Sequence, residues 1–509
     1  MLRESWFHRV SDEDQRVFDI VVPRDHFLIK VLAMFPWDSL VELLEVHYAT
    51  DKGRPAISPL VMLKLEYLRY HYRLSDREVI DRAETDLAFR EFLQLSLKTP
   101  IPCPSSLCVF RGRLGLVAFR TLFDKVVGSA RELGFVRDRL RIKDATHVIG
   151  NMAIPTALAL VAQTRNKLLE AAKPFAPNLV AGEEINLDLI RESTKKQPVQ
   201  QRLAARLGQL RSMLDWADQV CAPQDATASW QHFLNQRDLA QKILEDQKPK
   251  TGDKTLSTTD PDARRGRHGH FYDGYMVDIL VDSDSEIITQ INVLPANGNE
   301  SMDAVTLLER EQAAHGNQVE SISIDGAGFS GPLLRTLESP HGLNVEAFVP
   351  VPAERVGGRF RSDDFTENPD SQTVTCPAGQ LSNPGSHSVR HESTRYRFTA
   401  SVCRACPLLQ RCMKTSPKTC GRTVCKSDYR VEHQRAKEKT ETDQYKQVKQ
   451  EHPKVERKLG EIMNRHGGRQ ANYFGIAKVA VQEVMAGMTT NIKRIVRLTC
   501  APLETLAAV

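Results

Sequence analysis

Three acidic residues, far apart in the sequence, are the side chains best suited to chemistry in this chain. Asp144 lies in the strand-like run RLRIKDATHVIG, Asp325 ends the strand-like run ESISID, and Glu456 lies in the helix-like segment HPKVERKLGEIMNRHG. Three carboxylates that converge can hold two Mg²⁺ ions, with Mn²⁺ as a substitute. Such ions activate water and stabilise the leaving oxygen in phosphodiester cleavage. We therefore test the hypothesis of a metal-dependent nuclease site.

Each acid also has an ordinary explanation. A single Asp in a strand is more often a surface or capping carboxylate than a catalytic one. Asp144 fits that explanation poorly, because it shares a strand face with Val148, where an unpaired carboxylate is costly. Asp325 is followed by Gly326 and Gly328, which would let the backbone turn sharply.

Glu456 is predicted near the start of a helix. Pro453 suits the first helical turn, three residues before Glu456. The neighbouring Val455, Leu459 and Ile462 form an apolar stripe at helical spacing. Glu456 flanks this stripe, so its side chain would reach over a sheet from the edge of the core.

The ten cysteines are best explained as reduced thiols or metal ligands. The N-terminal residues MLRESWFHRVSDEDQ contain no apolar segment of the signal-peptide type, so disulfides are not expected. A set with one CxxC pair suits tetrahedral structural Zn²⁺. Its four members are Cys376, Cys403, Cys406 and Cys412. Unmetallated thiols are the alternative, and Cys420 or Cys425 could replace one ligand.

Bulk composition permits several classes of protein. The chain has 509 residues, of which 41% are hydrophobic and 26% charged, so it can bury large cores. A net charge of +5 allows nucleic-acid binding without arguing for it, because only clustered charge matters. No apolar run approaches the roughly 20 residues of a membrane span, so a cytoplasmic protein is expected.

The first part of the chain is predicted to be helical. Apolar residues recur at helical spacing over residues 17–137. Ser58 before Pro59 is typical of an N-cap followed by proline at the first helical position. Ser75, with Glu78 three residues later, matches a capping box.

The elements that would carry the acids follow in an α/β order. After the strand with Asp144, residues 156–247 predict an inserted helical hairpin. The alternating runs YMVDILVD and EIITQINVL then predict a β-hairpin. A helix, the strand ending at Asp325 and a further strand come next. The predicted fold class is α/β, with a ribonuclease H-like core, an all-α N-terminal domain, a helical insertion and a Cys-rich insertion.

Basic residues gather at three places. One cluster, just before the hairpin, consists of Arg264, Arg265, Arg267, His268 and His270. Such a cluster suits contacts to phosphates, although a solvated charged turn is an equal alternative. Arg111 and Arg113 in the N-terminal helices, and Lys493 and Arg494 near the end, are the other candidates for DNA binding.

Several segments in the same order resemble insertion-sequence transposases of the DDE type. The resemblance is to the group of these transposases that has a helical N-terminal domain and a cysteine-bearing insertion before the last acid. The matching segments are GRPAISPLVMLKLEYLRYHYRLSDREVIDRAETDLAFREFLQL, PSSLCVFRGRL, KDATHV, DPDAR, DGYMVDILVD, SISIDGAGFSG, VERKLGEIM and NIKRI. This resemblance implies that Asp144, Asp325 and Glu456 are the catalytic, Mg²⁺-binding triad. His452 and Met463 depart from the family pattern around Glu456, which makes Glu461 an alternative third acid.

The resemblance also implies partners and domain roles. The chain is expected to cut and join double-stranded DNA at terminal inverted repeats and target sites, as a homodimer on DNA, associated with the bacterial nucleoid. The predicted domains are 1–137 (helical, binding DNA ends), 138–155 (first core strand), 156–250 (helical insertion), 251–354 (ribonuclease H-like core), 355–430 (Cys-rich insertion) and 431–509 (C-terminal helices completing the core). A catalytically inactive, transposase-derived DNA-binding protein is the main alternative, and an α/β scaffold with structural zinc is another.

Overall fold

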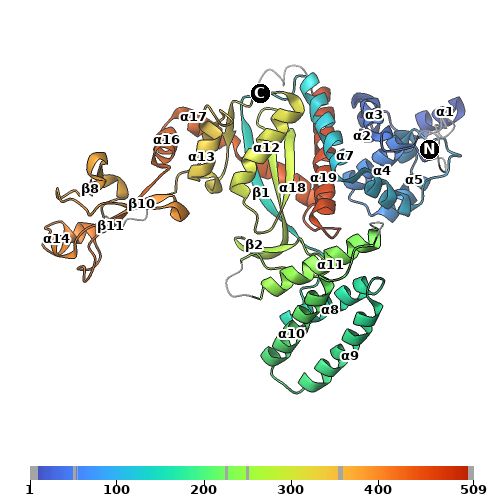
Figure 1. Cartoon of the computed structure of the whole chain (residues 1–509). Helices are drawn as coiled ribbons and strands as arrows, with labels where there is room; N and C mark the ends of the chain where they lie inside the picture. Colours follow the sequence, from blue (N-terminus) through green and yellow to red (C-terminus); the bar gives the residue numbers. More distant parts are fainter. Residues whose placement is uncertain are drawn as a thin grey trace. The chain divides into compact units, whose positions relative to one another are not determined.

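The protein is a mixed α/β structure made of two compact units (Figure 1). The computed structural model describes residues 10–49, 53, 56–223, 227–247, 252–352 and 359–501. Unit 1 consists of Met1–Arg137, Asp144–Glu300 and Val455–Val509, and unit 2 of Asp138–Lys143 and Ser301–Lys454. None of the helices in these described stretches combines the length and apolarity needed to cross a membrane.

Unit 1 begins with the predicted helical region. Its helices are α1 (Asp12–Val21), α2 (Phe27–Met34), α3 (Val41–Glu45), α4 (Pro59–His71), α5 (Asp76–Thr85), α6 (Leu87–Leu93) and α7 (Pro104–Glu132). The capping box at α5 is confirmed, since Ser75 and Glu78 exchange both backbone-to-side-chain hydrogen bonds. Pro59 is the first residue of α4, although the Ser58 side chain makes no capping hydrogen bond. Gly115 interrupts α7 with φ of 66°, a conformation that favours glycine.

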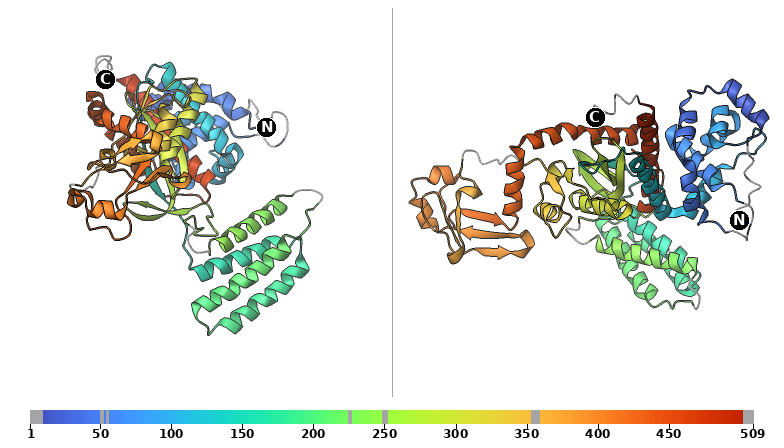
Figure 2. Two further views of the ribbon diagram at one scale, coloured as in Figure 1. Left: turned by 60° about the vertical axis from the view of Figure 1, so that its left-hand side comes forward. Right: turned by 90° about the horizontal axis from the view of Figure 1, so that it is seen from above.

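The predicted helical insertion contains four helices rather than one hairpin. They are α8 (Ala157–Ala172), α9 (Pro177–Thr194), α10 (Val199–Ala217) and α11 (Ala228–Glu245). Figure 2 shows them lying side by side. Their apolar faces share a core that includes Leu168, Leu210, Met213 and Phe233.

The remainder of unit 1 is built around strands. The predicted hairpin is confirmed as antiparallel β3 (His270–Asp282) and β4 (Ile288–Pro295), and β2 (Arg264–His268) adds to the other side of β3. Over the whole sheet the strand order is β2–β3–β1–β5–β6, with β4 paired to β3. Two C-terminal helices complete the unit, α18 (Pro453–Arg465) and α19 (Ile476–Cys500). The buried face of α19 packs against α7 and β4.

Unit 2 contains a parallel part of the sheet. The first residues of β1 (Arg141–Ile149) pair with β5 (Ser321–Ser323), and β5 pairs with β6 (Glu346–Phe348). Helix α12 (Glu300–His315) precedes β5, and α13 (Gly331–Glu338) connects β5 to β6. Arg141 and Glu311 form an ion pair with an N–O distance of 2.7 Å, and both side chains are fully buried.

Unit 2 also contains the cysteine region and two helices that follow it. The cysteine region has two small antiparallel sheets, β7–β8 and β9–β10–β11. Its elements are β7 (Thr366–Asn368), β8 (Thr373–Thr375), β9 (Ser386–Ser388), β10 (Ser393–Arg397), α14 (Ala400–Arg404), α15 (Leu409–Cys412) and β11 (Thr423–Ser427). Two helices follow, α16 (Arg430–Thr440) and α17 (Asp443–Glu451).

Candidate functional site

Asp144 lies in the middle of β1, as the sequence predicted. Its side chain is half-buried, between the buried residues Lys143 and Ala145. One carboxylate oxygen accepts the backbone N–H of Ala145 at 2.8 Å. The strand therefore holds the carboxylate in a partly enclosed position.

Asp325 lies just beyond β5, where it caps a short 3₁₀ helix. Its carboxylate accepts the backbone N–H of Ala327 at 3.1 Å. The predicted turn at the following glycines is a 3₁₀ helix (Gly326–Gly328) without positive φ, and a Cβ at Gly328 would lie 2.8 Å from Ile324 and from Val349. Close packing behind Asp325, rather than a left-handed backbone, therefore requires glycine at this position.

Asp325 has a neighbour that the sequence analysis did not identify as part of the site. The buried His452 lies 2.9 Å from the Ser323 hydroxyl through Nδ1, and it interacts electrostatically with Asp325. Burial lowers the pKa of His452 to about 4, Lys449 lowers it further, and Asp325 opposes both effects. His452 is therefore neutral at pH 7. The missed signal was its position four residues before Glu456, one helical turn away.

Glu456 lies in the first turn of α18, which begins at Pro453 as predicted. Val455, Leu459 and Ile462 are buried, so the predicted apolar stripe is confirmed. The side chain of Glu456 is exposed. The helix thus buries one face and leaves this carboxylate accessible.

Glu461, the alternative third acid, is occupied by cations. Its carboxylate lies 3.3 Å from the Lys458 ammonium and 3.1 Å from that of Lys493. Hydrogen bonding from His466 and these two lysines hold the pKa of Glu461 well below its usual range, against the opposing effect of burial. Glu461 is a structural partner of α19 and a poor candidate for metal binding.

Several predicted DNA contacts already have protein partners. Lys493 is only 7% exposed and pairs with Glu461, which leaves it little surface for a contact to DNA. The others with partners are Arg111 (Glu66 and Asp76), Arg264 (Asp253), Arg265 (Asp273) and Arg494 (the Ser285 carbonyl). Arg113 and Arg267 are exposed, over the rings of Tyr48 and Phe271 respectively.

Four cysteines of unit 2 line one small cavity, and they are the predicted set: Cys376, Cys403, Cys406 and Cys412. The cavity has a volume of about 30 Å³, and its other walls are mainly apolar. Burial raises the pKa of the Cys412 thiol, and the other three thiols raise it further, against Arg422. Cys420 and Cys425 are exposed and do not line the cavity.

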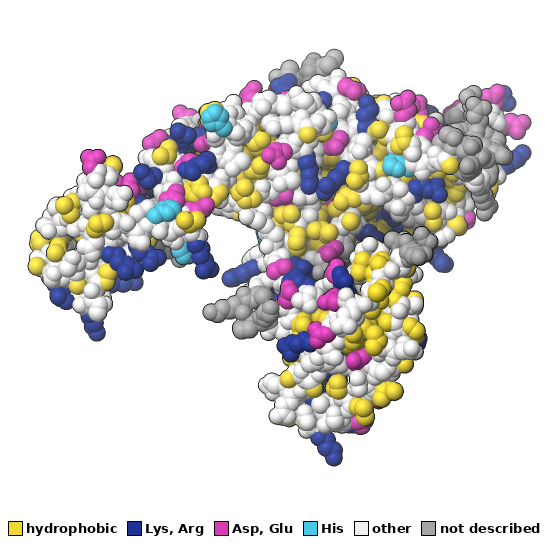
Figure 3. Space-filling view, viewed as in Figure 1, with side chains coloured by type: hydrophobic (Ala, Val, Ile, Leu, Met, Phe, Trp, Pro, Cys, Tyr) yellow, Lys and Arg dark blue, Asp and Glu magenta, His cyan; other side chains and the backbone are white. Residues whose placement is uncertain are grey.

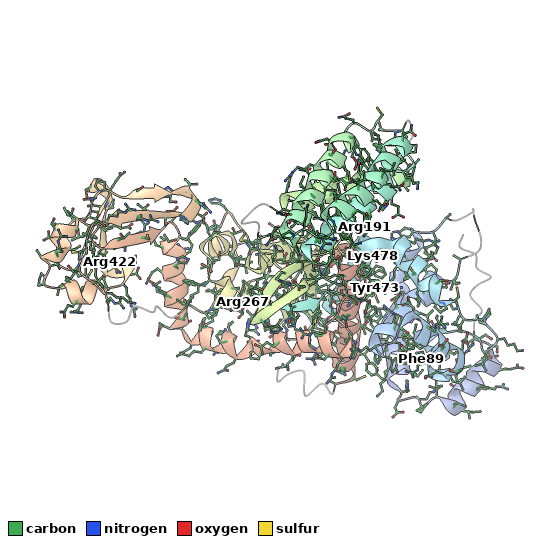
Figure 4. All side chains as sticks on the ribbon, turned by 90° about the horizontal axis from the view of Figure 1, so that it is seen from below. Phe89, Arg191, Arg267, Arg422, Tyr473 and Lys478 are labelled. Carbon is green, nitrogen blue, oxygen red and sulfur yellow. The ribbon has the colours of Figure 1, made fainter. Side chains whose placement is uncertain are left out.

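The backbone is arranged around two of these sulfurs. Cys376 Sγ accepts the N–H of Gln380 and Cys403 Sγ accepts that of Arg422, each at 3.4 Å. A Cβ at Gly421 would lie 2.7 Å from Cys403 Sγ. Arg422, labelled in Figure 4, donates to the carbonyl of Cys412. Backbone N–H groups directed at sulfur stabilise thiolates.

No group of three or more His, Cys, Asp or Glu side chains is close enough to hold a metal ion, among the residues that the structure describes. This holds both for the three acids and for the four thiols. The acids are distributed over the two units, with Asp144 and Glu456 in unit 1 and Asp325 in unit 2.

Two family models match the chain. Residues 16–113 match a transposase domain (DUF772), and residues 375–496 match a transposase DDE domain. Together the two matches are consistent with a DDE-type insertion-sequence transposase. No curated protein and no solved structure matched it.

The two transposase matches cover different parts of the site. The first includes Arg111 and Arg113, and the second includes the four cysteines, Glu456, Lys493 and Arg494. Asp144 and Asp325 lie outside both matches. Transposase domains act on DNA, so DNA is the partner that the family indicates.

Proposed function

We propose that this chain is a DDE-type DNA transposase that cuts the ends of its element and joins them to target DNA. Asp144, Asp325 and Glu456 would be the acids of a ribonuclease H-like core. The two family matches support the general activity. The assignment of these particular acids depends mainly on strand register.

The register of β1 and β5 supports the pairing of the two aspartates. These parallel strands place Arg141 opposite Ile322 and Ile142 opposite Ser323, an offset of 181 residues. The same offset separates Asp144 from Asp325. Asp325 lies two residues past the last residue of β5, so continuation of this register beyond the strand would make the two acids neighbours, which is the arrangement that a shared cation needs.

Helix geometry supports Glu456 as the third acid. His452, at the C-terminal end of α17, has helical φ and ψ of −52° and −38°, so α17 passes almost directly into α18. Glu456 therefore follows His452 by one helical turn. Since His452 contacts Ser323, two residues before Asp325, Glu456 would project from the same side of the helix.

The three carboxylates fit divalent magnesium in ligand type, because Mg²⁺ prefers a few carboxylate oxygens and keeps several waters. Bound Mg²⁺, or Mn²⁺ in its place, would activate water and neutralise charge at the scissile phosphate. Hydrolysis breaks the bond to the 3′ oxygen and frees a 3′-hydroxyl. That hydroxyl then attacks a target phosphodiester and displaces its 3′ oxygen, so no covalent protein intermediate is needed.

We further propose that the four cysteines hold a structural Zn²⁺. Four sulfur ligands match the tetrahedral preference of zinc in number and type. Their common cavity and the two N–H···S hydrogen bonds support this assignment. Zinc would serve stability rather than catalysis.

Other parts of the proposal concern DNA and assembly. Arg113 and Arg267 remain as exposed candidates for phosphate contacts. The N-terminal helices (1–137) would bind the element's ends, and pairing of two ends would require a homodimer on DNA.

A cleavage assay with Mg²⁺ tests the proposal, on DNA that carries the terminal repeats flanking the coding region. We expect Asp144→Asn and Asp325→Asn to lower nicking at least about a hundredfold, because each removes charge that stabilises the transition state. Glu461→Gln is the matched control and should retain nicking if it remains folded. DNA binding without nicking by the unmutated protein would instead favour an inactive transposase-derived binding protein.

A further inference from the structure

Three histidines of unit 1 lie together at the ends of neighbouring strands. The ring of His147 on β1 is 5.6 Å from that of His268 and 5.7 Å from that of His270, between centroids. His268 and His270 are paired across the tip of the β2–β3 hairpin, with only Gly269 between them. Gly269 has φ of 72°, so the tip depends on glycine. Both tip histidines are exposed.

An arginine from a distant part of the sequence joins this cluster. Arg469 Nη1 lies 3.1 Å from His147 Nε2 and donates to the His147 carbonyl, also at 3.1 Å. Its backbone is tied to the end of β1, since Ile149 donates to the Arg469 carbonyl and Ala471 donates to that of Ile149. Arg469 has no carboxylate ion-pair partner among the described residues.

Buried groups on α19 hold the loop that carries Arg469. The Gln482 amide donates to the carbonyls of Gly467 and Gln470 and accepts the N–H of Asn472. Next to it, Glu483 is fully buried and interacts electrostatically with Arg469. Burial raises the pKa of Glu483 well above its usual value, which disfavours the charged form that would compensate the guanidinium.

The outer edge of the cluster has the character of a nucleic-acid surface. Arg267, labelled in Figure 4, lies on β2 beside His268 with its guanidinium 5.7 Å from the ring of Phe271. Phe271 is 69% exposed, which is unusual for so large an apolar side chain. An exposed aromatic ring beside arginine suits sugar or base contacts next to a phosphate.

We propose that Arg469, His147, His268 and His270 form a binding site for a phosphate of the DNA backbone. The guanidinium fork and the imidazole N–H groups of the exposed His268 and His270 would donate to the phosphate oxygens, with His147 positioning Arg469. Of these four residues, His147 and Arg469 were not assigned to DNA from the sequence. This inference rests on the proposed function, because it takes DNA as the substrate.

The cluster also predicts a pH dependence. The charged and titratable groups around His147 are Arg469 from the loop, His268 from β2, and His270 and Tyr272 from β3. Burial, followed by the positive charges of Arg469 and the two histidines, lowers the pKa of His147. A bound phosphate would offset that repulsion, so binding should take up protons and strengthen as the pH falls.

The test measures binding of the full chain to a random-sequence DNA duplex over a range of salt concentrations. We expect Arg469→Gln to weaken binding and to reduce the slope of log K against log salt by about 1, the value for one phosphate contact. The double variant His268→Gln/His270→Gln, which changes only side chains at the exposed hairpin tip, should weaken binding and reduce its strengthening at low pH. Arg191→Gln on α9 is the matched control, because that exposed arginine lies beside Asp188 and Glu192.

Unchanged salt slopes and pH dependence in both variants would overturn the phosphate site. So would binding of Ni²⁺ or Zn²⁺ by the unmutated protein that is lost in the histidine double variant, since the cluster would then be a metal site. Nicking by the unmutated protein is measured in parallel. If nicking persists while the slopes do not change, this inference fails and the proposed transposase activity stands; if the unmutated protein neither binds nor nicks DNA, both fail.

Discussion

The helical insertion (α8–α11) and the cysteine region (β7–β11 with α14 and α15) differ in the size of the hydrophobic core that stabilises them. The insertion has fourteen buried apolar residues in its core, whereas the cysteine region has five, in the parts that the structure describes. Partly buried cysteines pack against the smaller core: Cys376, Cys403 and Cys412. A core of five side chains provides little hydrophobic stabilisation, so the zinc ion proposed above would supply an additional cross-link.

Both regions also leave apolar side chains on their surfaces. Figure 3 shows hydrophobic side chains gathered on the outside of the helical insertion. Ile185 and Leu189 on α9 are 64% and 61% exposed. The cysteine region buries Phe365 and Phe398 in its centre but also exposes apolar residues, with Leu381 at 62% and Val389 at 82%.

Removing the proposed zinc ion should produce the largest difference in stability between the two regions. With a chelator, or in Cys403→Ser, we expect the cysteine region to lose nearly all protection in hydrogen exchange, while α8–α11 keep theirs, because metal binding and folding are coupled only in the former. Metal content, measured by elemental analysis, should fall together with protection. Cys221→Ser is the control, since Cys221 is exposed and lies after α10. Full protection in Cys403→Ser without bound metal would contradict the zinc proposal.

A substitution in the larger core sharpens the same contrast. Phe233 is fully buried in the core of α8–α11. Phe233→Ala should lower the free energy of opening of these helices by about 3–5 kcal/mol, because it removes buried area and leaves a cavity. Hydrogen exchange of their amides measures the change, and added zinc should not restore it. If zinc restored the stability of α8–α11 in Phe233→Ala, these helices would also depend on metal binding, and the contrast with the cysteine region would be wrong.

The smallest expected effect is at the exposed face of α9. Leu189→Ser should change the free energy of opening of the same helices by no more than about 0.5 kcal/mol, because the side chain is already largely in water. The measurement is again hydrogen exchange, beside Phe233→Ala. A loss of several kcal/mol would show that Leu189 is covered in solution.

Local patterns in the sequence predicted most of the elements. Ser75 with Glu78 marked the start of α5, and alternating apolar residues marked β3 and β4. Strand β2 was missed because RRGRH has no apolar alternation. Its place depends on Gly266, where a Cβ would lie 2.2 Å from the Ala296 carbonyl.

The parts of the site that escaped prediction depend on contacts between distant residues. Ser323 and His452 are 129 residues apart, and Arg469 and His147 are 322 apart. A single sequence gives the type of each side chain without its partner. The same limit explains Lys493, whose basic neighbourhood suggested DNA until the structure paired it with Glu461.

The interleaving of the two units has a consequence for synthesis on the ribosome. Unit 1 takes its first helices from residues before 138 and its closing helix, α19, from residues after 475. Until α19 emerges, the faces of α7 and β4 that it covers have no partner. Unit 1 therefore cannot complete its core until all of unit 2 has been translated, so the two units cannot fold strictly one after the other during synthesis.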